Sequence, residues 1–218
     1  MNYILFDGTV RDALLPFTFT RPVADIRVGI LTIREKWEIY MNSTASFITQ
    51  DYLMHKYPMN VSEDNWIING SVFPNPKFVK LVHQLTTNQA ILSDGELLAA
   101  RLDYAQFELL NSDKPIEQIE GIEIPKGDGY QKVNQLSDLF TLNGSQIESD
   151  FDLITNKRKS ESLNGSNQII GDKSALFIEK GAIVNCATIN TTGGPVYIGK
   201  DAEIMEGSLV RGPFAMNE

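Results

Sequence analysis

Short apolar segments separated by polar turns fill the first two thirds of the chain, and their spacing alternates between that of strands and that of helices. Apolar runs at residues 3–6 and 66–68 predict buried strands, and two further runs on either side of residues 93–95 predict a hairpin. Apolar side chains recur at helical spacing over residues 27–41 and 77–85. Strands that alternate with helices in this way predict an α/β domain.

From Ile170 onward the apolar positions repeat with a period of six. An aliphatic residue opens each hexad and a mostly small residue follows four places later, in the sets Ile178, Val184, Ile198, Ile204, Val210 and Ala182, Thr188, Ala202, Ser208, Phe214. This period is typical of hexapeptide β-helices. Each hexad forms one flat side of a coil, and its aliphatic side chain fills the axis.

The two patterns divide the chain into an α/β domain over residues 1–155, a polar linker over 156–169 and part of a hexapeptide β-helix over 170–218. The repeats continue to the last residue without a visible cap. An open coil edge at that point would expose apolar side chains and unpaired strand groups. We therefore expect either a longer protein or partner chains that cover the edge, and we favour the longer protein.

Charge and composition narrow the classes of partner. The 218 residues include 28 acidic and 19 basic side chains, for a formal net charge of -9, so we expect no general binding to nucleic acid or to anionic membranes. A small anionic ligand needs only one basic pocket and stays possible. The single cysteine allows neither an internal disulfide nor a cysteine-based zinc site. No apolar run approaches the roughly 20 residues that span a bilayer, and we expect a cytoplasmic protein.

A loop with two arginines follows the first strand. It contains Gly8 and Thr9, then Arg11, then Leu-Pro-Phe-Thr at residues 15–18, then Arg21 followed by proline. Glycine lets backbone N–H groups approach a phosphate closely, and arginine neutralises phosphate charge. The same residues also fit a turn that is held by salt bridges, so the residues alone leave both interpretations open.

The chain resembles the sugar-1-phosphate nucleotidylyltransferases that are fused to acyltransferase β-helices. It looks most like a divergent bacterial branch of the bifunctional N-acetylglucosamine-1-phosphate uridylyltransferase / glucosamine-1-phosphate acetyltransferase family. The likeness lies in the loop, which is similar to the family pattern G-x-G-T-R-L-x-P-L-T followed by Lys-Pro, and in the tail "GPVYIGKDAEIMEGSLVRGPFAMNE". The resemblance implies a Rossmann-like nucleotidyltransferase domain with a mixed sheet, followed by the start of a left-handed parallel β-helix.

The resemblance also implies a reaction. A sugar 1-phosphate oxygen would attack the α-phosphorus of UTP or dTTP and release pyrophosphate, giving a sugar nucleotide of the UDP-N-acetylglucosamine type. Gly8 and Thr9 would bring backbone N–H groups to the triphosphate. Arg11 would stabilise charge at the reacting centre, and Arg21 would stand where the family has its loop lysine. Mg²⁺ would be the cofactor, and the β-helix would form a homotrimer in the full-length protein.

Several positions depart from the family pattern. Asp7 stands beside Gly8 where the family has a small residue. The family's Gly-Asp after a buried strand, whose aspartate holds Mg²⁺, corresponds here to residues 69–71. The resemblance places Asn69 and Gly70 in the substrate site and Ser71 at the first metal position, although serine is a weak ligand compared with carboxylate. It places Asn143 at the second metal position.

Two further observations leave the function open. Arg101 follows a strand that could line the sugar pocket, so it is a further candidate for substrate binding. Residues 170–218 contain no histidine, the general base that acyltransferases of this architecture commonly use, so we assign no acyl transfer to the residues present. The alternatives to an active nucleotidyltransferase are a catalytically degenerate sugar-nucleotide-binding domain that serves an acyltransferase, and a solenoid whose main role is to trimerise the chain.

Overall fold

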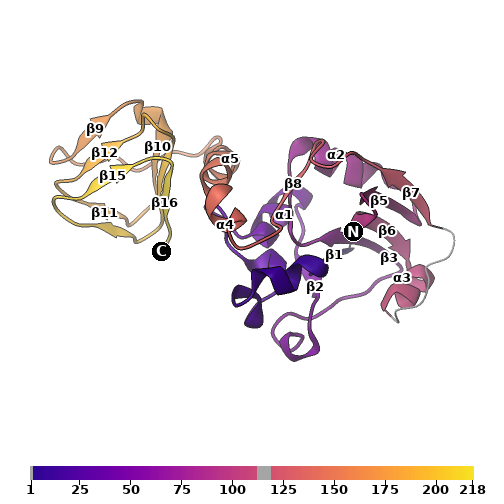
Figure 1. Ribbon diagram of the computed structural model, residues 1–218. Coiled ribbons are helices and arrows are strands. Elements are labelled where there is room, and N and C mark those ends of the chain that lie inside the picture. Colours follow the sequence, from indigo (N-terminus) through magenta and orange to yellow (C-terminus); the bar gives the residue numbers. More distant parts are fainter. Residues whose placement is uncertain (1, 112–118) are drawn as a thin grey trace. The chain divides into compact units, whose positions relative to one another are not determined.

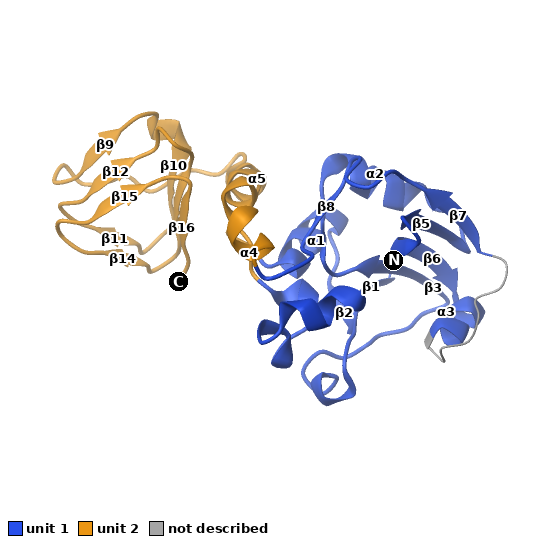
Figure 2. Ribbon diagram, viewed as in Figure 1, with its two compact units in different colours: residues 1–26, 32–136 blue, residues 27–31, 137–218 orange. Residues whose placement is uncertain are grey.

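The computed structural model describes residues 2–111 and 119–218, and the chain divides into two compact units (Figures 1 and 2). Unit 1 comprises residues 1–26 and 32–136, and unit 2 comprises residues 27–31 and 137–218. The boundary inferred from the sequence, at residue 155, lies at the far end of a helix that belongs to unit 2.

The centre of unit 1 is a six-stranded mixed sheet with the strand order β2-β1-β3-β6-β5-β7 (Figure 1). Strands β2, β1 and β3 are parallel, β6 runs antiparallel to β3 and β5, and β7 is parallel to β5. The strands are β1 (Asn2–Phe6), β2 (Ala45–Ile48), β3 (Asp64–Asn69), β5 (Gln89–Ser93), β6 (Glu96–Asp103) and β7 (Glu120–Glu123). The α/β class and the mixed sheet are therefore confirmed.

Helix α1 (Ile33–Met41) begins later than its apolar spacing suggested. Thr32 accepts a hydrogen bond from the N–H of Glu35, and the Glu35 side chain accepts one from the N–H of Thr32, which forms a capping box. The predicted start at Arg27 is wrong, because Gly29 has a φ of 92° that no helix contains.

The other helices of unit 1 are α2 (Pro76–Gln84) and α3 (Tyr104–Asn111). Asn75 caps α2 by accepting from the N–H of Phe78, and Pro76 occupies the first turn, where its missing N–H costs nothing. Trp37 of α1 is buried, donates to the carbonyl of Val72 at 2.8 Å and meets the edge of the Phe78 ring. Trp37 is thus a core residue.

Short elements complete unit 1 around the ends of the sheet. A two-stranded antiparallel sheet joins β4 (Val72–Phe73) to β8 (Gln131–Lys132). Four 3-10 turns are η1 (Thr9–Leu14), η2 (Phe17–Phe19), η3 (Val23–Asp25) and η4 (Asp51–Leu53). Residues 112–118 lie outside the described residues.

Unit 2 contains helices α4 (Asp138–Thr141) and α5 (Asn143–Thr155) and three small parallel sheets (Figure 2). The sheets are β15-β12-β9, β10-β13-β16 and β11-β14, so the chain visits the three sheets in turn and each sheet takes every third strand. The strands are β9 (Gln168–Ile170), β10 (Leu176–Ile178), β11 (Ile183–Val184), β12 (Thr188–Asn190), β13 (Val196–Ile198), β14 (Glu203–Ile204), β15 (Leu209–Arg211) and β16 (Phe214–Met216).

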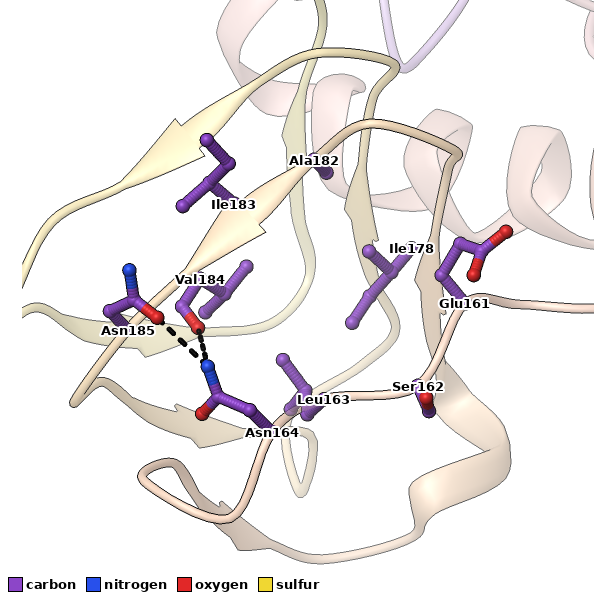
Figure 3. Close-up of a pocket in the computed structure, with 9 residues that line it drawn as sticks. All are labelled: Glu161, Ser162, Leu163, Asn164, Ile178, Ala182, Ile183, Val184 and Asn185. Carbon is purple, nitrogen blue, oxygen red and sulfur yellow. Dashed lines mark hydrogen bonds between the residues drawn. The ribbon is translucent and has the colours of Figure 1, made fainter.

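The aliphatic residues that open the hexads form the core of these sheets. Four of them are buried, and the fifth is half-buried against the same cluster: Ile178, Val184, Ile198, Ile204 and Val210. The segment read as a linker also contributes, because Leu163 packs on this core. Figure 3 shows Leu163 beside Ile178 and Val184. These three residues are among those that line a cavity of about 220 Å³.

Unit 2 also includes a segment from the N-terminal part of the chain, Arg27–Leu31, which we call the strap. The backbone N–H groups of Ile30 and Leu31 both donate to one carboxylate oxygen of Asp150, at 2.9 and 3.1 Å. Ile30 is buried in a cluster with side chains of α5 and of sheet β10-β13-β16. The apolar spacing of Ile30, which suggested a helix, instead reflects this packing.

Candidate functional site

The candidate site begins where β1 and β3 end side by side. Gly8 follows β1 with a φ of 59°, and a Cβ there would lie 3.2 Å from Nδ2 of Asn69, the last residue of β3. The N–H of Gly70 donates to the carbonyl of Phe6 at 2.8 Å. The structure therefore brings Gly8, Asn69 and Gly70 together at the carboxyl ends of neighbouring parallel strands, the edge where open α/β sheets bind ligands.

The side chain of Asn69 is fixed on both sides. Its Oδ1 accepts from the N–H and the hydroxyl of Ser71, at 3.0 and 2.7 Å, while its Nδ2 donates to Glu96 at 3.2 Å and to the carbonyl of Leu97. Ser71 is fully buried, and its hydroxyl donates a hydrogen bond to Asn69. Ser71 thus shapes the turn after β3, and its oxygen is buried away from solvent.

Asp7, the unexpected acid beside Gly8, faces the protein. One carboxylate oxygen accepts from the N–H of Val23 at 2.7 Å, and the other accepts from the hydroxyl of Thr49 at 2.6 Å and lies 3.6 Å from Nε of Arg11. Burial raises the pKa of Asp7, and these partners act in the opposite direction. Asp7 therefore ties the loop after β1 back onto the ends of β1 and β2.

Arg11 stabilises the conformation of that loop through hydrogen bonds to the protein. Its Nη2 donates to the carbonyl of Thr18 at 3.0 Å and to the hydroxyl of Tyr52 at 2.6 Å, and its Nη1 lies 3.4 Å from Asp12. The side chain is only 11% exposed. Most of its donors are therefore occupied by the protein, which is the arrangement expected of the salt-bridged turn.

Arg21 and Thr9 occupy the open side of the loop. Both side chains are exposed, as is Gly8. No hydrogen bond or ion pair within residues 2–111 and 119–218 involves Arg21. The loop that opens with Gly8 thus carries an exposed guanidinium with no partner among the described residues.

Lys132 and Glu96 extend the site on the other side of Asn69. Glu96 accepts from Asn69 through one oxygen and forms an ion pair with the ammonium of Lys132 through the other. Lys132 also lines a cavity of about 510 Å³ together with Lys126 and Tyr130. Sequence analysis missed Lys132 because β4 and β8 are two residues long and leave no periodic signal.

Arg101 lies elsewhere on the sheet. It pairs in register with Trp66, its guanidinium stacks 4.4 Å from the Trp66 ring, and it forms a bidentate ion pair with Asp64 at the start of β3. Hydrogen bonding to Asp64 raises the pKa of Arg101 further. Arg101 is therefore near the amino end of β3, away from Gly8, and the structure does not bring these two candidates together.

Asn143 belongs to unit 2, where it holds the strap. Its Oδ1 accepts from the N–H of Gly29 at 2.8 Å, next to the hydrogen bonds that Asp150 makes to the same segment. In the part of the chain that the structure describes, no group of three or more His, Cys, Asp or Glu side chains is arranged to hold a metal ion. The side-chain oxygen of Asn143 is occupied by the N–H of Gly29, and that of Ser71 is fully buried against Asn69, so neither oxygen fits a resident Mg²⁺ site.

Comparison with known proteins identifies the family of the chain. A sequence-family model described as sugar nucleotidyl transferase matches residues 3–159, more than half of the chain, so the chain belongs to this family. Among solved structures, the chain is similar to a CTP:phosphocholine cytidylyltransferase from Streptococcus pneumoniae, with 12% identity and a TM-score of 0.36 over 65% of this chain and 97% of that chain. A search of curated proteins found no match. Among the helices of the described residues, none is long and apolar enough to cross a membrane.

Proposed function

We propose that the protein is a sugar-1-phosphate nucleotidylyltransferase that transfers a nucleotidyl group from UTP or dTTP to a hexose or N-acetylhexosamine 1-phosphate. The observation that carries the proposal is the meeting of Gly8, Asn69 and Gly70 at the carboxyl ends of β1 and β3, in a chain of this family. Close approach of a phosphate needs backbone without a side chain, which exposed Gly8 supplies. Gly70 is buried, and its N–H holds the ends of β1 and β3 together through the carbonyl of Phe6.

In the proposed reaction, an oxygen of the sugar 1-phosphate forms a bond to the α-phosphorus of the triphosphate. The bond from the α-phosphorus to the bridging oxygen breaks, and pyrophosphate leaves with the bonding electrons. The protein mainly positions the two phosphates and neutralises their charge. Exposed Arg21 would contact the triphosphate beside the N–H groups of Gly8 and Thr9, while Arg11 would act by holding the loop in place.

Mg²⁺ fits this proposal as part of the substrate. The residues at Asn69 to Ser71 use their side-chain oxygens on one another. We therefore propose that Mg²⁺ enters bound to the triphosphate. Chelation by EDTA would then abolish turnover without changing the unfolding temperature of the protein.

Unit 2 supports a second part of the proposal. The regular alternation among three parallel sheets and the buried hexad residues are what the start of a left-handed β-helix would give. We propose that this β-helix resembles those of acyltransferases and forms a homotrimer in the full-length protein. A cytoplasmic location, with no nucleic-acid or membrane partner, fits the net charge of -9.

The proposal is tested by following pyrophosphate release with UTP or dTTP and a panel of sugar 1-phosphates. Arg21→Ala should lower kcat/KM by a factor on the order of 10 to 100, because a free cation at the phosphates is lost. Arg211→Ala removes an equally exposed arginine of β15 and should leave kcat/KM unchanged. Absence of pyrophosphate release with every sugar phosphate tested would count against an active transferase.

One observation favours the second candidate, a degenerate domain that binds a sugar nucleotide and serves an acyltransferase or trimerising β-helix. The position that would hold a metal carries Ser71, fully buried and bonded to Asn69. Such a domain would bind UDP-N-acetylglucosamine in calorimetry and release no pyrophosphate from UTP. Turnover in the release assay would exclude it.

A further inference from the structure

The loop after β1 carries an aromatic arm, which we define as residues 16–21. Thr18, at its middle, is fully buried, and its hydroxyl donates to the carbonyl of Arg11 at 2.8 Å. Its own carbonyl accepts from Arg11 Nη2 at 3.0 Å. Phe17 and Phe19 flank this anchor and are 52% and 57% exposed. The two rings therefore stand in solvent on a backbone that is held in place.

A third exposed ring lies beside the arm. Tyr52 of η4 is 60% exposed, and its hydroxyl accepts from the same Arg11 Nη2 that contacts the carbonyl of Thr18. An exposed aromatic ring forgoes the stabilisation that its burial would give. Three such rings gathered around one anchored turn indicate a surface that a ligand covers.

Charge near the rings indicates what kind of ligand this is. Arg21 follows Phe19 by two residues, is exposed, and has no hydrogen-bond or ion-pair partner within the described residues. Gly8, whose neighbour Asp7 holds the loop through Val23, exposes its backbone nearby. Exposed apolar rings on the same loop as an unpaired cation and an exposed glycine complement a molecule with a planar ring and several phosphates.

We propose that the aromatic arm stacks on the base of the nucleoside triphosphate while Arg21 and the Gly8 turn hold its phosphates. The proposal rests on the function proposed above and adds the part of the site that holds the base. Stacking on an aromatic face works for every base. The arm therefore supplies affinity for nucleotides in general, and other groups select the base.

The test measures the binding of UTP and of inorganic tripolyphosphate to the full 218-residue chain by calorimetry. The double variant Phe17→Ala/Phe19→Ala should bind UTP more weakly by a factor on the order of 10 to 100 and bind tripolyphosphate as tightly as the wild type. Tyr104→Ala removes a ring of α3 that is 54% exposed and should change neither affinity. Phe19→Trp should keep UTP affinity, and its fluorescence should respond to UTP but not to tripolyphosphate.

The outcomes separate this proposal from the one on which it rests. Unchanged UTP affinity in the double variant overturns the role of the arm and leaves the nucleotidyltransferase proposal standing. Failure of the wild type to bind either ligand overturns both. A double variant that changes the oligomeric state in light scattering, with UTP affinity intact, assigns the arm to a contact between copies of the chain and overturns base stacking.

Discussion

Replacing Arg11 by alanine should destabilise unit 1 and should not act directly on phosphate binding. The change removes two hydrogen bonds from a charged donor, to the carbonyl of Thr18 and the hydroxyl of Tyr52, and the positive charge beside buried Asp7. Net hydrogen bonds contribute about 1 kcal/mol each, and those of charged groups contribute somewhat more. We expect the free energy of unfolding to fall by about 2–4 kcal/mol, or roughly 5–15 °C in the midpoint of thermal unfolding.

The assay is thermal and urea unfolding of the wild type, Arg11→Ala and Arg21→Ala, followed by circular dichroism, with pyrophosphate release measured on the same samples. Exposed Arg21 should change stability by less than about 0.5 kcal/mol while lowering kcat/KM. The two arginines should thus separate into one that affects stability and one that affects turnover. If Arg11→Ala abolishes turnover while its free energy of unfolding stays within about 0.5 kcal/mol of the wild type, Arg11 acts on the substrate, and its structural role in the loop is refuted.

Three further perturbations test other parts of the structure. Burial raises the pKa of Asp7 above its ordinary 3.8. The stability that protonated Asp7 contributes is therefore complete below pH 3.8 and is lost as pH rises through the pKa of the folded state. Urea unfolding at several pH values should show a smaller loss of stability with rising pH in Asp7→Asn than in the wild type. Burial and a hydrogen bond to Glu179 raise the pKa of Tyr197 to about 12, so the stability that its neutral form contributes is complete below pH 10 and is lost as pH rises through 12. An absorbance titration of Tyr197→Phe should lack the component near pH 12. A component near pH 12 that persists in this variant would contradict the assignment. A Cβ on Gly29 would clash with a carboxylate oxygen of Asp150 and lie 2.8 Å from the backbone carbonyl carbon of Gln146. Gly29→Ala should therefore cost at least about 2 kcal/mol more in urea unfolding than Gly95→Ala, which also has a positive φ but lies in open space. Equal costs would show that both neighbours move away freely.

The sequence predicted those elements in which buried residues recur at a regular spacing along a short segment. Strand β3 and the hexads of unit 2 carry runs of apolar residues that need only their own period to be recognised. The start of α1 was misjudged because Ile30 lies at helical spacing for a different reason, its packing in unit 2. A local pattern cannot show which distant element an apolar side chain will meet.

The site was predicted only in part, because a local pattern does not show which distant residues will meet. The glycine turn after β1 and the turn after β3 are local features, and the parallel pairing of the strands brought them together. The contact of Arg11 with Tyr52, and the contact between Asn69 and Lys132 through Glu96, join residues far apart in the chain. Hydrogen bonds of this kind follow from the fold and leave no spacing in the sequence.

The strap has a consequence for how the protein can be taken apart. Because residues 27–31 belong to unit 2, the chain crosses between the units three times, after residues 26, 31 and 136. A fragment that ended at residue 136 would leave the N–H groups of Gly29, Ile30 and Leu31 without the acceptors Asn143 and Asp150. The complementary fragment would lose the buried Ile30. The two units are therefore not interchangeable modules, and recombination or engineering that replaces unit 2 must carry a matching strap inserted into unit 1.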